Sequence, residues 1–244
     1  MKKVFFALIL SLFVEQTARA SEDISAYKKE CLGFISRPKV EVYGSYGKLR
    51  YNYDKDSAYL TKEQEKKLQE YSQSETMEMK VLGLTKMKDV VDFKSEFAKL
   101  SLNRGYNCLY PENITISIDY YLPTIYIAKE LEKGTCLYDV TLRHERTHAQ
   151  IYIEALDYFL PLLKKYADSL FDNVGIRVVS SQESVDDAMK ELSAAYHDAV
   201  QKKIDAWYRS VEKEQLKMDT FEQYTLESSI CKKIEAESSD NEDF

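Results

Sequence analysis

The sequence predicts an α+β fold with an N-terminal β-rich part of antiparallel strands, followed by two long helices packed antiparallel. Before about residue 138, apolar and polar residues alternate in short runs, as half-buried strands do. After that point, apolar residues recur every three or four positions, which is typical of amphipathic helices. Strands that precede helices indicate α+β rather than alternating α/β. We expect a single domain over residues 21–232 and an acidic, disordered tail over 233–244.

The first twenty residues are typical of a cleaved export signal. Two lysines precede an apolar run over residues 4–14, and Ala18-Arg19-Ala20 supplies the small-x-small cleavage pattern. The apolar run is shorter than the roughly 20 residues that a membrane-spanning helix needs. We therefore predict an exported protein, periplasmic or secreted, with no membrane span after signal cleavage.

The charge of the chain bears on its partners. The formal net charge is −7, and removal of residues 1–20, which carry +2, leaves −9. Nucleic-acid phosphates are bound by clustered Lys and Arg side chains, and the sequence has no such cluster. We expect no nucleic-acid partner.

The N-terminal part is expected to contain a helix, a hairpin, a second helix and a strand. Residues 21–36 have helical apolar spacing, and residues 39–54 alternate on both sides of Gly-Ser-Tyr-Gly, as in a β-hairpin. Residues 60–73 read as a mostly polar surface helix, which a capping box opens. Residues 78–85 read as a strand.

The middle and C-terminal parts are expected to hold a strand pair and the two long helices. Two runs rich in β-branched and aromatic residues, between residues 113 and 132, are separated by Pro123 and predict the strand pair. A helix begins near Tyr138 and is kinked or ended by Pro161. The clearest amphipathic helix spans Gln182 to about Gln215.

Four cysteines lie after the signal, an even number that predicts two disulfides in an exported chain. Their spacing is too long for a thiolate zinc site. We expect the pairs Cys108–Cys136, on either side of the strand pair, and Cys31–Cys231, which would join the two ends.

Two of the three histidines of the chain stand four residues apart in His144-Glu145-Arg146-Thr147-His148. On a helix, positions i and i+4 share one face, so two imidazoles so placed can bind one metal ion. A glutamate directly after the first histidine lies off the ligand line and can act on a metal-bound water as a general base. The expected cofactor is Zn²⁺.

The export signal, the strands and a helix that bears this motif together resemble the zinc metallopeptidases called zincins. The resemblance implies that His144 and His148 bind zinc, that Glu145 is the catalytic base, and that a third ligand lies downstream. The chain also resembles, more loosely, exported bacterial proteins classed as zinc-dependent proteases, through GTCLYDVTLRHERTH and KMDTFEQY.

The third ligand is predicted from the packing of the two long helices. Antiparallel packing around a connection at residues 171–181 places residues of about 199–207 opposite the histidine pair. His197 lies just short of this window, and we rank it first because imidazole is a common zinc ligand. The alternatives are three acidic residues of the same helix: Asp205, Asp198 and Glu191.

These patterns predict an exported zinc-dependent metallopeptidase that hydrolyses peptide bonds in proteins or in the peptide cross-links of a cell wall. Two alternatives stay open. One is a non-catalytic secreted or envelope binding protein, and the other is a metal-binding protein without hydrolase activity. The sequence has no Gly-rich phosphate loop and no Gly-x-Ser-x-Gly elbow, which argues against other catalytic classes.

Overall fold

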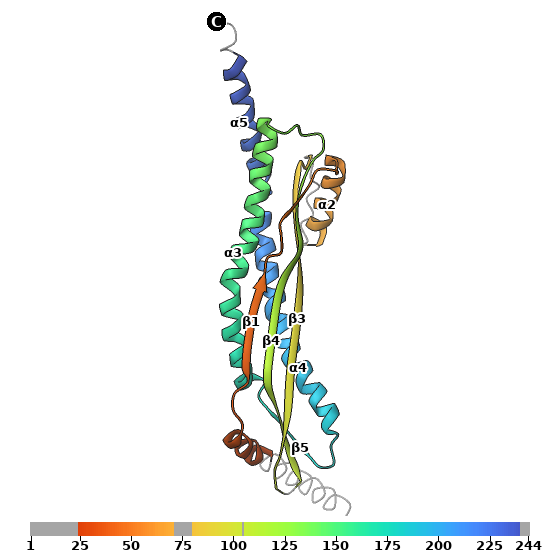
Figure 1. The fold of residues 1–244 in the computed structure, drawn as a ribbon, viewed down its shortest axis with the longest axis vertical. Helices are drawn as coiled ribbons and strands as arrows, with labels where there is room; N and C mark the ends of the chain where they lie inside the picture. The colour runs from red at the N-terminus through yellow and green to blue at the C-terminus, as the bar shows by residue number, and fades with distance from the viewer. Residues whose placement is uncertain (1–23, 71–79, 104, 240–244) are drawn as a thin grey trace, which may run out of the picture. The chain divides into compact units, whose positions relative to one another are not determined.

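A computed structural model describes residues 24–70, 80–103 and 105–239, so the predicted export signal lies outside the described residues. A helix over residues 24–34 comes first. The elements that follow, labelled in Figure 1, are β1 (Lys39–Ser45), β2 (Arg50–Asn52), α2 (Ser57–Glu70), β3 (Gly83–Ser101), β4 (Tyr106–Ile127), α3 (Cys136–Asn173), β5 (Arg177–Ser180), α4 (Val185–Leu216) and α5 (Phe221–Ser239).

The sheet has five strands arranged around β4, which pairs with β1, β2, β3 and β5. β2 runs parallel to β4, with Arg50 opposite Thr124, whereas β5 runs antiparallel to it, with Tyr106 opposite Ser180. Figure 1 shows β4 between β1 and β3. The prediction of an N-terminal part with antiparallel strands is therefore wrong, because β2 is parallel to β4 and β5 follows the first long helix.

The predicted hairpin over residues 39–54 does not form. β1 and β2 each pair with β4 and not with each other. Between them the backbone stays close to β4 at Gly47, which has a φ of +61° and where a Cβ would lie 2.6 Å from the carbonyl oxygen of Tyr120. Alternating polarity reports which face of a strand is buried but does not report its partner or its direction, which explains the error.

The predicted strand pair around Pro123 is one continuous strand. β4 crosses this proline, and Leu122 before it adopts a φ of 50°. Alternate side chains of its middle part, such as Ile116, Ile118 and Tyr120, are buried. This period of two is what a strand with one covered face requires.

Contacts divide the chain into two compact units, where the sequence predicts one domain. Unit 1 comprises residues up to Val42, Phe93–Ile116 and Leu163–Lys203, and unit 2 comprises Tyr43–Asp92, Ser117–Leu162 and the residues from Ile204 onward. The long strands and helices contribute residues to both units.

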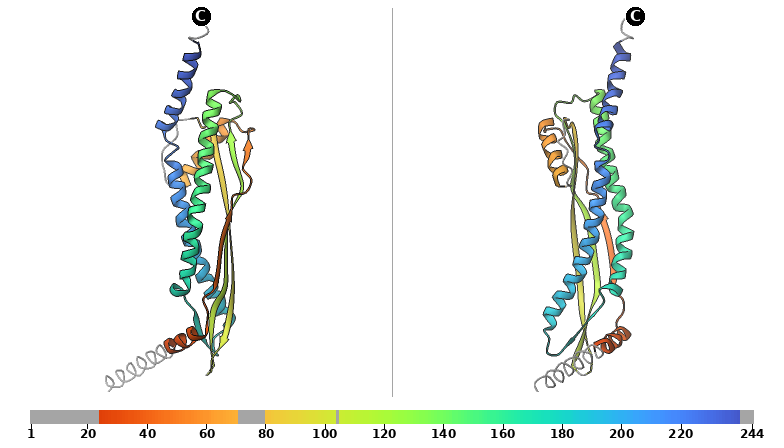
Figure 2. Two further views of the ribbon diagram at one scale, coloured as in Figure 1. Left: turned by 60° about the vertical axis from the view of Figure 1, so that its left-hand side comes forward. Right: turned by 180° about the vertical axis from the view of Figure 1, so that it is seen from behind.

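Within unit 2, α3 and α4 run in opposite directions on the same side of the strands (Figure 2). Phe159 of α3 stacks on Trp207 of α4 with ring centroids 4.5 Å apart, and Tyr152, earlier in α3, donates a hydrogen bond to Glu212, later in α4. The Tyr152 ring also packs edge-on against Tyr120 of β4. These aromatic contacts fix the helices on the sheet.

Each unit contains one disulfide. Cys31 is bonded to Cys108 in unit 1, and Cys136 is bonded to Cys231 in unit 2. The prediction of two disulfides is confirmed, but both predicted pairings are wrong. The reason is β4: a single extended strand advances by about 3.3 Å per residue, so it separates Cys108 from Cys136 instead of folding back to join them.

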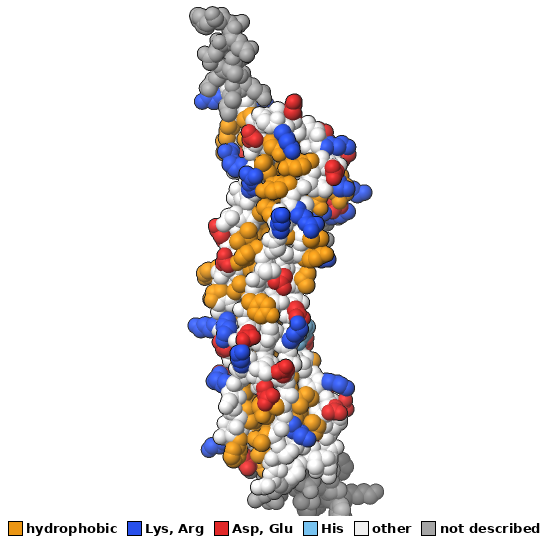
Figure 3. Space-filling view, in the orientation of Figure 1, with side chains coloured by type: hydrophobic (Ala, Val, Ile, Leu, Met, Phe, Trp, Pro, Cys, Tyr) orange, Lys and Arg blue, Asp and Glu red, His pale blue; other side chains and the backbone are white. Residues whose placement is uncertain are grey.

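The C-terminal helix was not expected from the sequence. α5 extends to Ser239, so it includes part of the predicted disordered tail, while residues 240–244 lie outside the described residues. Among the described helices, none combines the length and the apolar composition needed to cross a membrane. On the face shown in Figure 3, acidic and basic side chains are intermixed, without a broad area of one sign.

Candidate metal centre

The two histidines and the glutamate of the motif lie in the first half of α3, which Thr135 caps by accepting a hydrogen bond from the backbone N–H of Tyr138. His144 and His148 lie one turn apart on the same face. All three motif side chains are buried, with exposed fractions of 3% for His144, 2% for Glu145 and 5% for His148. A buried cluster of two imidazoles and a carboxylate needs partners for each polar atom.

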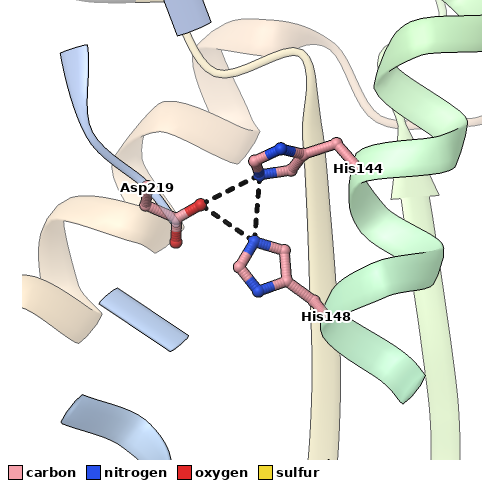
Figure 4. A group of neighbouring side chains, drawn as sticks. All are labelled: His144, His148 and Asp219. Carbon is pink, nitrogen blue, oxygen red and sulfur yellow. Dashed lines mark hydrogen bonds and ion pairs between the residues drawn. The ribbon is translucent and has the colours of Figure 1, made fainter. Parts of the chain in front are cut away.

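Asp219 provides the third side chain of this cluster. It lies in the short connection between α4 and α5, directly before Thr220, whose hydroxyl caps α5 by accepting a hydrogen bond from the Gln223 N–H. The Asp219 Oδ1 atom is 3.2 Å from Nε2 of His144 and 2.9 Å from Nε2 of His148, and the two Nε2 atoms are 3.0 Å apart (Figure 4). One ligand atom from each residue therefore faces a common point.

The dimensions of this triangle suit a zinc ion. Zinc binds imidazole nitrogen at about 2.0–2.1 Å and carboxylate oxygen at a similar distance, so tetrahedral donors lie roughly 3.3 Å from one another. The observed separations of 2.9–3.2 Å need only a small expansion. Two histidines and one carboxylate leave a fourth coordination position, as catalytic zinc sites do.

The outer nitrogens of both rings are also held. His144 Nδ1 lies 3.2 Å from a carboxylate oxygen of Glu227 in α5, and His148 Nδ1 donates to the side-chain oxygen of Gln215 in α4. The amide nitrogen of Gln215 in turn donates to the His148 carbonyl oxygen at 3.0 Å. Acceptors on Nδ1 favour the tautomer in which Nε2 is free to bind a metal, and they fix the ring orientation.

Glu145 is held in place by β3. The Thr85 hydroxyl lies 2.8 Å from Oε2 of Glu145 and 2.8 Å from its carbonyl oxygen. Gly83 allows this close approach, because a Cβ at that position would lie 2.5 Å from Oε1 and 2.6 Å from Cγ of Glu145. The strand thus packs directly against the glutamate carboxylate, and any larger residue at this position would have to displace it.

A small cavity adjoins these groups. It has a volume of about 10 Å³, which is about the space for one water molecule. Its walls include Glu145, His148, Asp219, Tyr224 and Gln64. Among the described residues, the buried side-chain oxygen of Gln64 has no hydrogen-bond partner there, while its nitrogen donates to Asp219 Oδ2 at 2.9 Å. An unpaired buried acceptor beside a water-sized space indicates a hydrated site.

The charges of the cluster compensate one another. Burial disfavours the charged form of His144, but three neighbouring carboxylates outweigh it and raise its pKa to about 9. Burial also opposes ionisation of Asp219, but the hydrogen bonds to the two rings hold the pKa of this carboxyl far below its usual range. Burial raises the pKa of Glu145. A divalent cation carries the same charge as the two protons that the rings would otherwise bind. The charge of these side chains therefore suits a divalent cation.

The third ligand predicted from the sequence does not belong to this group. His197 is in unit 1, where it is half exposed and its ring packs edge-on against Phe93 and lies 3.6 Å from Asp198. Glu191 pairs with Arg177 in the same unit. Asp205 is in unit 2 but, among the described residues, it does not join the three side chains that could hold a metal ion. Asp219 takes the place that was assigned to His197.

The error came from the predicted register of the helices. α3 continues to Asn173 and the connection contains β5, so Gln215, and not a residue in 199–207, reaches His148. The segment KMDTFEQY, noted for its likeness to exported zinc-dependent proteases, contains Asp219. A Thr-x-x-Gln capping box directly after Asp219 could have revealed the start of α5.

Comparisons with protein-family models, with curated proteins and with solved structures gave no match. The case for a function therefore depends on the chemistry of the site alone.

Proposed function

We propose that this protein is an exported zinc-dependent peptidase. The observation that carries the proposal is the convergence of His144, His148 and Asp219 donor atoms beside a water-sized cavity that Glu145 also lines. Two disulfides fit an exported protein, since such bonds persist in oxidising compartments. The substrate class is protein or peptide, including the peptide cross-links of a cell wall.

Zinc held by His144, His148 and Asp219 would lower the pKa of a bound water and polarise a substrate carbonyl. Glu145 is the general base: its carboxylate lines the water-sized cavity, accepts the proton of the attacking water and returns it to the leaving nitrogen. Thr85 holds the orientation of Glu145 through the 2.8 Å hydrogen bond to Oε2.

Tyr224 is the hydroxyl best placed to donate to the oxygen of the substrate carbonyl. It lines the same cavity, its ring lies 5.2 Å from that of His144, and its hydroxyl donates to Asp219 Oδ1 at 3.0 Å. With a metal ion on Oδ1, this hydroxyl proton would be free to turn to the substrate oxygen, and a donor at the position where negative charge develops stabilises the transition state.

The alternative of a metal-binding protein without hydrolase activity predicts a site that no substrate reaches. A groove of about 320 Å³ lies next to the cavity and shares Lys67, Thr85 and Tyr152 with it, and a space for a substrate beside the site supports the peptidase over this alternative. The alternative of a non-catalytic binding protein does not explain why donor atoms of His144, His148 and Asp219 are buried close together.

The test is zinc content together with hydrolysis. The wild-type protein, purified without added metal, is expected to contain about one zinc per chain. Glu145→Gln should keep the zinc and lose hydrolysis of a mixed protein substrate such as casein, or of isolated cell-wall peptide. Glu154→Gln, an exposed position of α3 where Gln150 donates a hydrogen bond at 2.9 Å, is the matched control and should retain both. A zinc-free wild type, or an active Glu145→Gln, would refute the proposal.

A further inference from the structure

A pocket, a small cavity and a groove of unit 2 lie one after another along the chain from Lys80 to Asp89. Lys80 and Leu82 line a cavity of about 220 Å³, whose other walls include Leu137 and Val140 of α3. Gly83, Leu84 and Thr85 line the water-sized cavity beside Glu145. The segment from Thr85 to Asp89 then lines the groove of about 320 Å³. The chain therefore passes from a pocket of mixed lining, which also includes Glu227, past the candidate metal centre and into a polar groove.

The edge of β3 that faces the groove is open among the described residues, where only β4 pairs with this strand. The Leu82 carbonyl oxygen accepts a hydrogen bond from the Ala128 N–H at the end of β4. Because successive residues of a strand point their backbone groups to opposite sides, Gly83 and Thr85 direct theirs away from β4. An extended peptide can pair with such an edge through main-chain hydrogen bonds.

Helices on both faces of β3 form the walls of the groove. Thr85 points to Glu145 of α3, and Lys86, on the opposite face, is 2.5 Å from Glu63 of α2. The groove is lined both by α2 residues, such as Glu63 and Lys66, and by Glu212 of α4. It must therefore lie at the edge of the strand, between the two layers of helices.

The polar groove has a surplus of positive charge at one wall. Lys66 and Lys86 both pair with the single carboxylate of Glu63, and together they lower its pKa to about 2. Lys67 pairs with Glu212 at 2.9 Å. Lys88, which is exposed, and Asp89 also line the groove, so four basic and three acidic side chains surround it. Two ammonium groups on one carboxylate leave room for a second anionic group, which a substrate side chain can supply.

We propose that the site selects peptides with an acidic residue on the groove side of the cleaved bond. A peptide paired with the open edge of β3 places this carboxylate against Lys66 and Lys86, on the face of the strand that α2 covers. This inference rests on the proposed peptidase function and names its substrate class.

The probes are fluorescence-quenched decapeptides of Ala and Gly that contain a single Glu, Gln or Lys, placed at each position in turn. Zinc-loaded full-length protein should cleave the Glu peptide with a kcat/KM about fivefold above that of the Gln peptide, the scale of one exposed ion pair. The Lys peptide should be the poorest substrate. The preference should disappear in 1 M NaCl, where the Debye length is about 3 Å.

Three variants test the residues. Lys66→Gln combined with Lys86→Gln should reduce the preference for Glu over Gln to below about twofold. Glu63→Gln should increase it, because both ammonium groups then face the peptide. Lys62→Gln, on the exposed side of α2 and outside the groove, is the matched control and should leave it unchanged. Opposite shifts in the first two variants cannot come from partial unfolding.

A binding measurement separates this inference from the peptidase function. Fluorescence anisotropy of labelled peptides with the Glu145→Gln variant should give the same order of affinity, with Glu tightest. Hydrolysis that does not discriminate between Glu, Gln and Lys would overturn the selectivity and leave the peptidase standing. Preferential binding of the Glu peptide without any hydrolysis by the wild type would support the selectivity and overturn the peptidase. Neither binding preference nor hydrolysis would overturn both.

Discussion

Gly83→Ala is a small change that should disable Glu145, the proposed base, without touching a proposed metal ligand. The added Cβ would lie 2.5 Å from Oε1 and 2.6 Å from Cγ of Glu145, and 2.8 Å from Cγ2 of Thr141. Contacts of this kind are comfortable only from about 3.5 Å, so the carboxylate must retreat by about 1 Å. Glu145 is 2% exposed and tied to Thr85, so it has little space in which to move.

We expect Gly83→Ala to lower both the stability of the protein and its rate of hydrolysis. Inserting a methyl group into a packed interior costs about 1–3 kcal/mol, which for a chain of this length lowers the Tm by roughly 2–10 °C. A displacement of about 1 Å in a catalytic group costs on the order of 10²-fold in rate. We therefore expect kcat/KM to fall about a hundredfold while zinc content stays near one per chain, because the two imidazoles and Asp219 are not displaced.

The assay combines metal analysis, thermal unfolding and peptide hydrolysis on the same preparation. Gly33→Ala is the matched control, since no atom of the described part of the chain lies within 4 Å of a Cβ built at that position. It should retain wild-type activity and stability. A Gly83→Ala protein with wild-type kcat/KM would show that Glu145 does not need its observed position, and the assignment of the base would be wrong.

Three further predictions concern the metal centre. Asp219→Asn should lower zinc affinity by more than the 10–100-fold typical of losing a residue that only orients a ligand, whereas His197→Ala should leave zinc content unchanged by metal analysis. Replacing Cys136 and Cys231 by alanine should destabilise the protein by roughly 4–5 kcal/mol in the chain-entropy model, and should also weaken zinc retention because α5 carries Glu227. In protein treated with EDTA, the raised pKa of His144, about 9, stabilises the fold fully below pH 6.5, so the Tm should fall as the pH rises from 6.5 to 9.

Each of these predictions has its own control. Equal zinc loss in His197→Ala and Asp219→Asn would contradict the assignment of Asp219 and support His197, the third ligand predicted from the sequence. Alanine at Cys31 and Cys108, the disulfide of unit 1, should destabilise the protein but leave zinc affinity intact. Zinc-loaded protein should show a flatter dependence of Tm on pH, because the metal replaces the protons on the rings. A Tm that rises from pH 6.5 to 9 after EDTA treatment would contradict the charge balance of the site.

The part of the site that could be predicted from the sequence is local. His144, Glu145 and His148 fall within one turn of a helix, so their relative positions follow from helix geometry once the helix is recognised. Asp219 lies 71 residues after His148, and its position depends on the lengths of α3, the connection and α4. An error of a few turns in that register led to His197.

Gly83 and Thr85 were read from the sequence only as members of a strand. Their role depends on which element packs against that strand, and alternating polarity does not contain this information. The same limit explains the disulfides: four cysteines in an exported chain predict two bonds, but their pairing depends on β4 being one strand and not two.

The sequence by itself determined the periodic elements, the presence of two disulfides and the spacing of two histidines and a glutamate on one helix, because each of these depends on neighbours within a turn or a strand. Only the tertiary structure decided the direction of the strands, the third donor Asp219, the close fit of Gly83 against Glu145 and the pockets along β3. These features require contacts between segments far apart in the chain, and such contacts are set by the packing of whole elements rather than by local pattern.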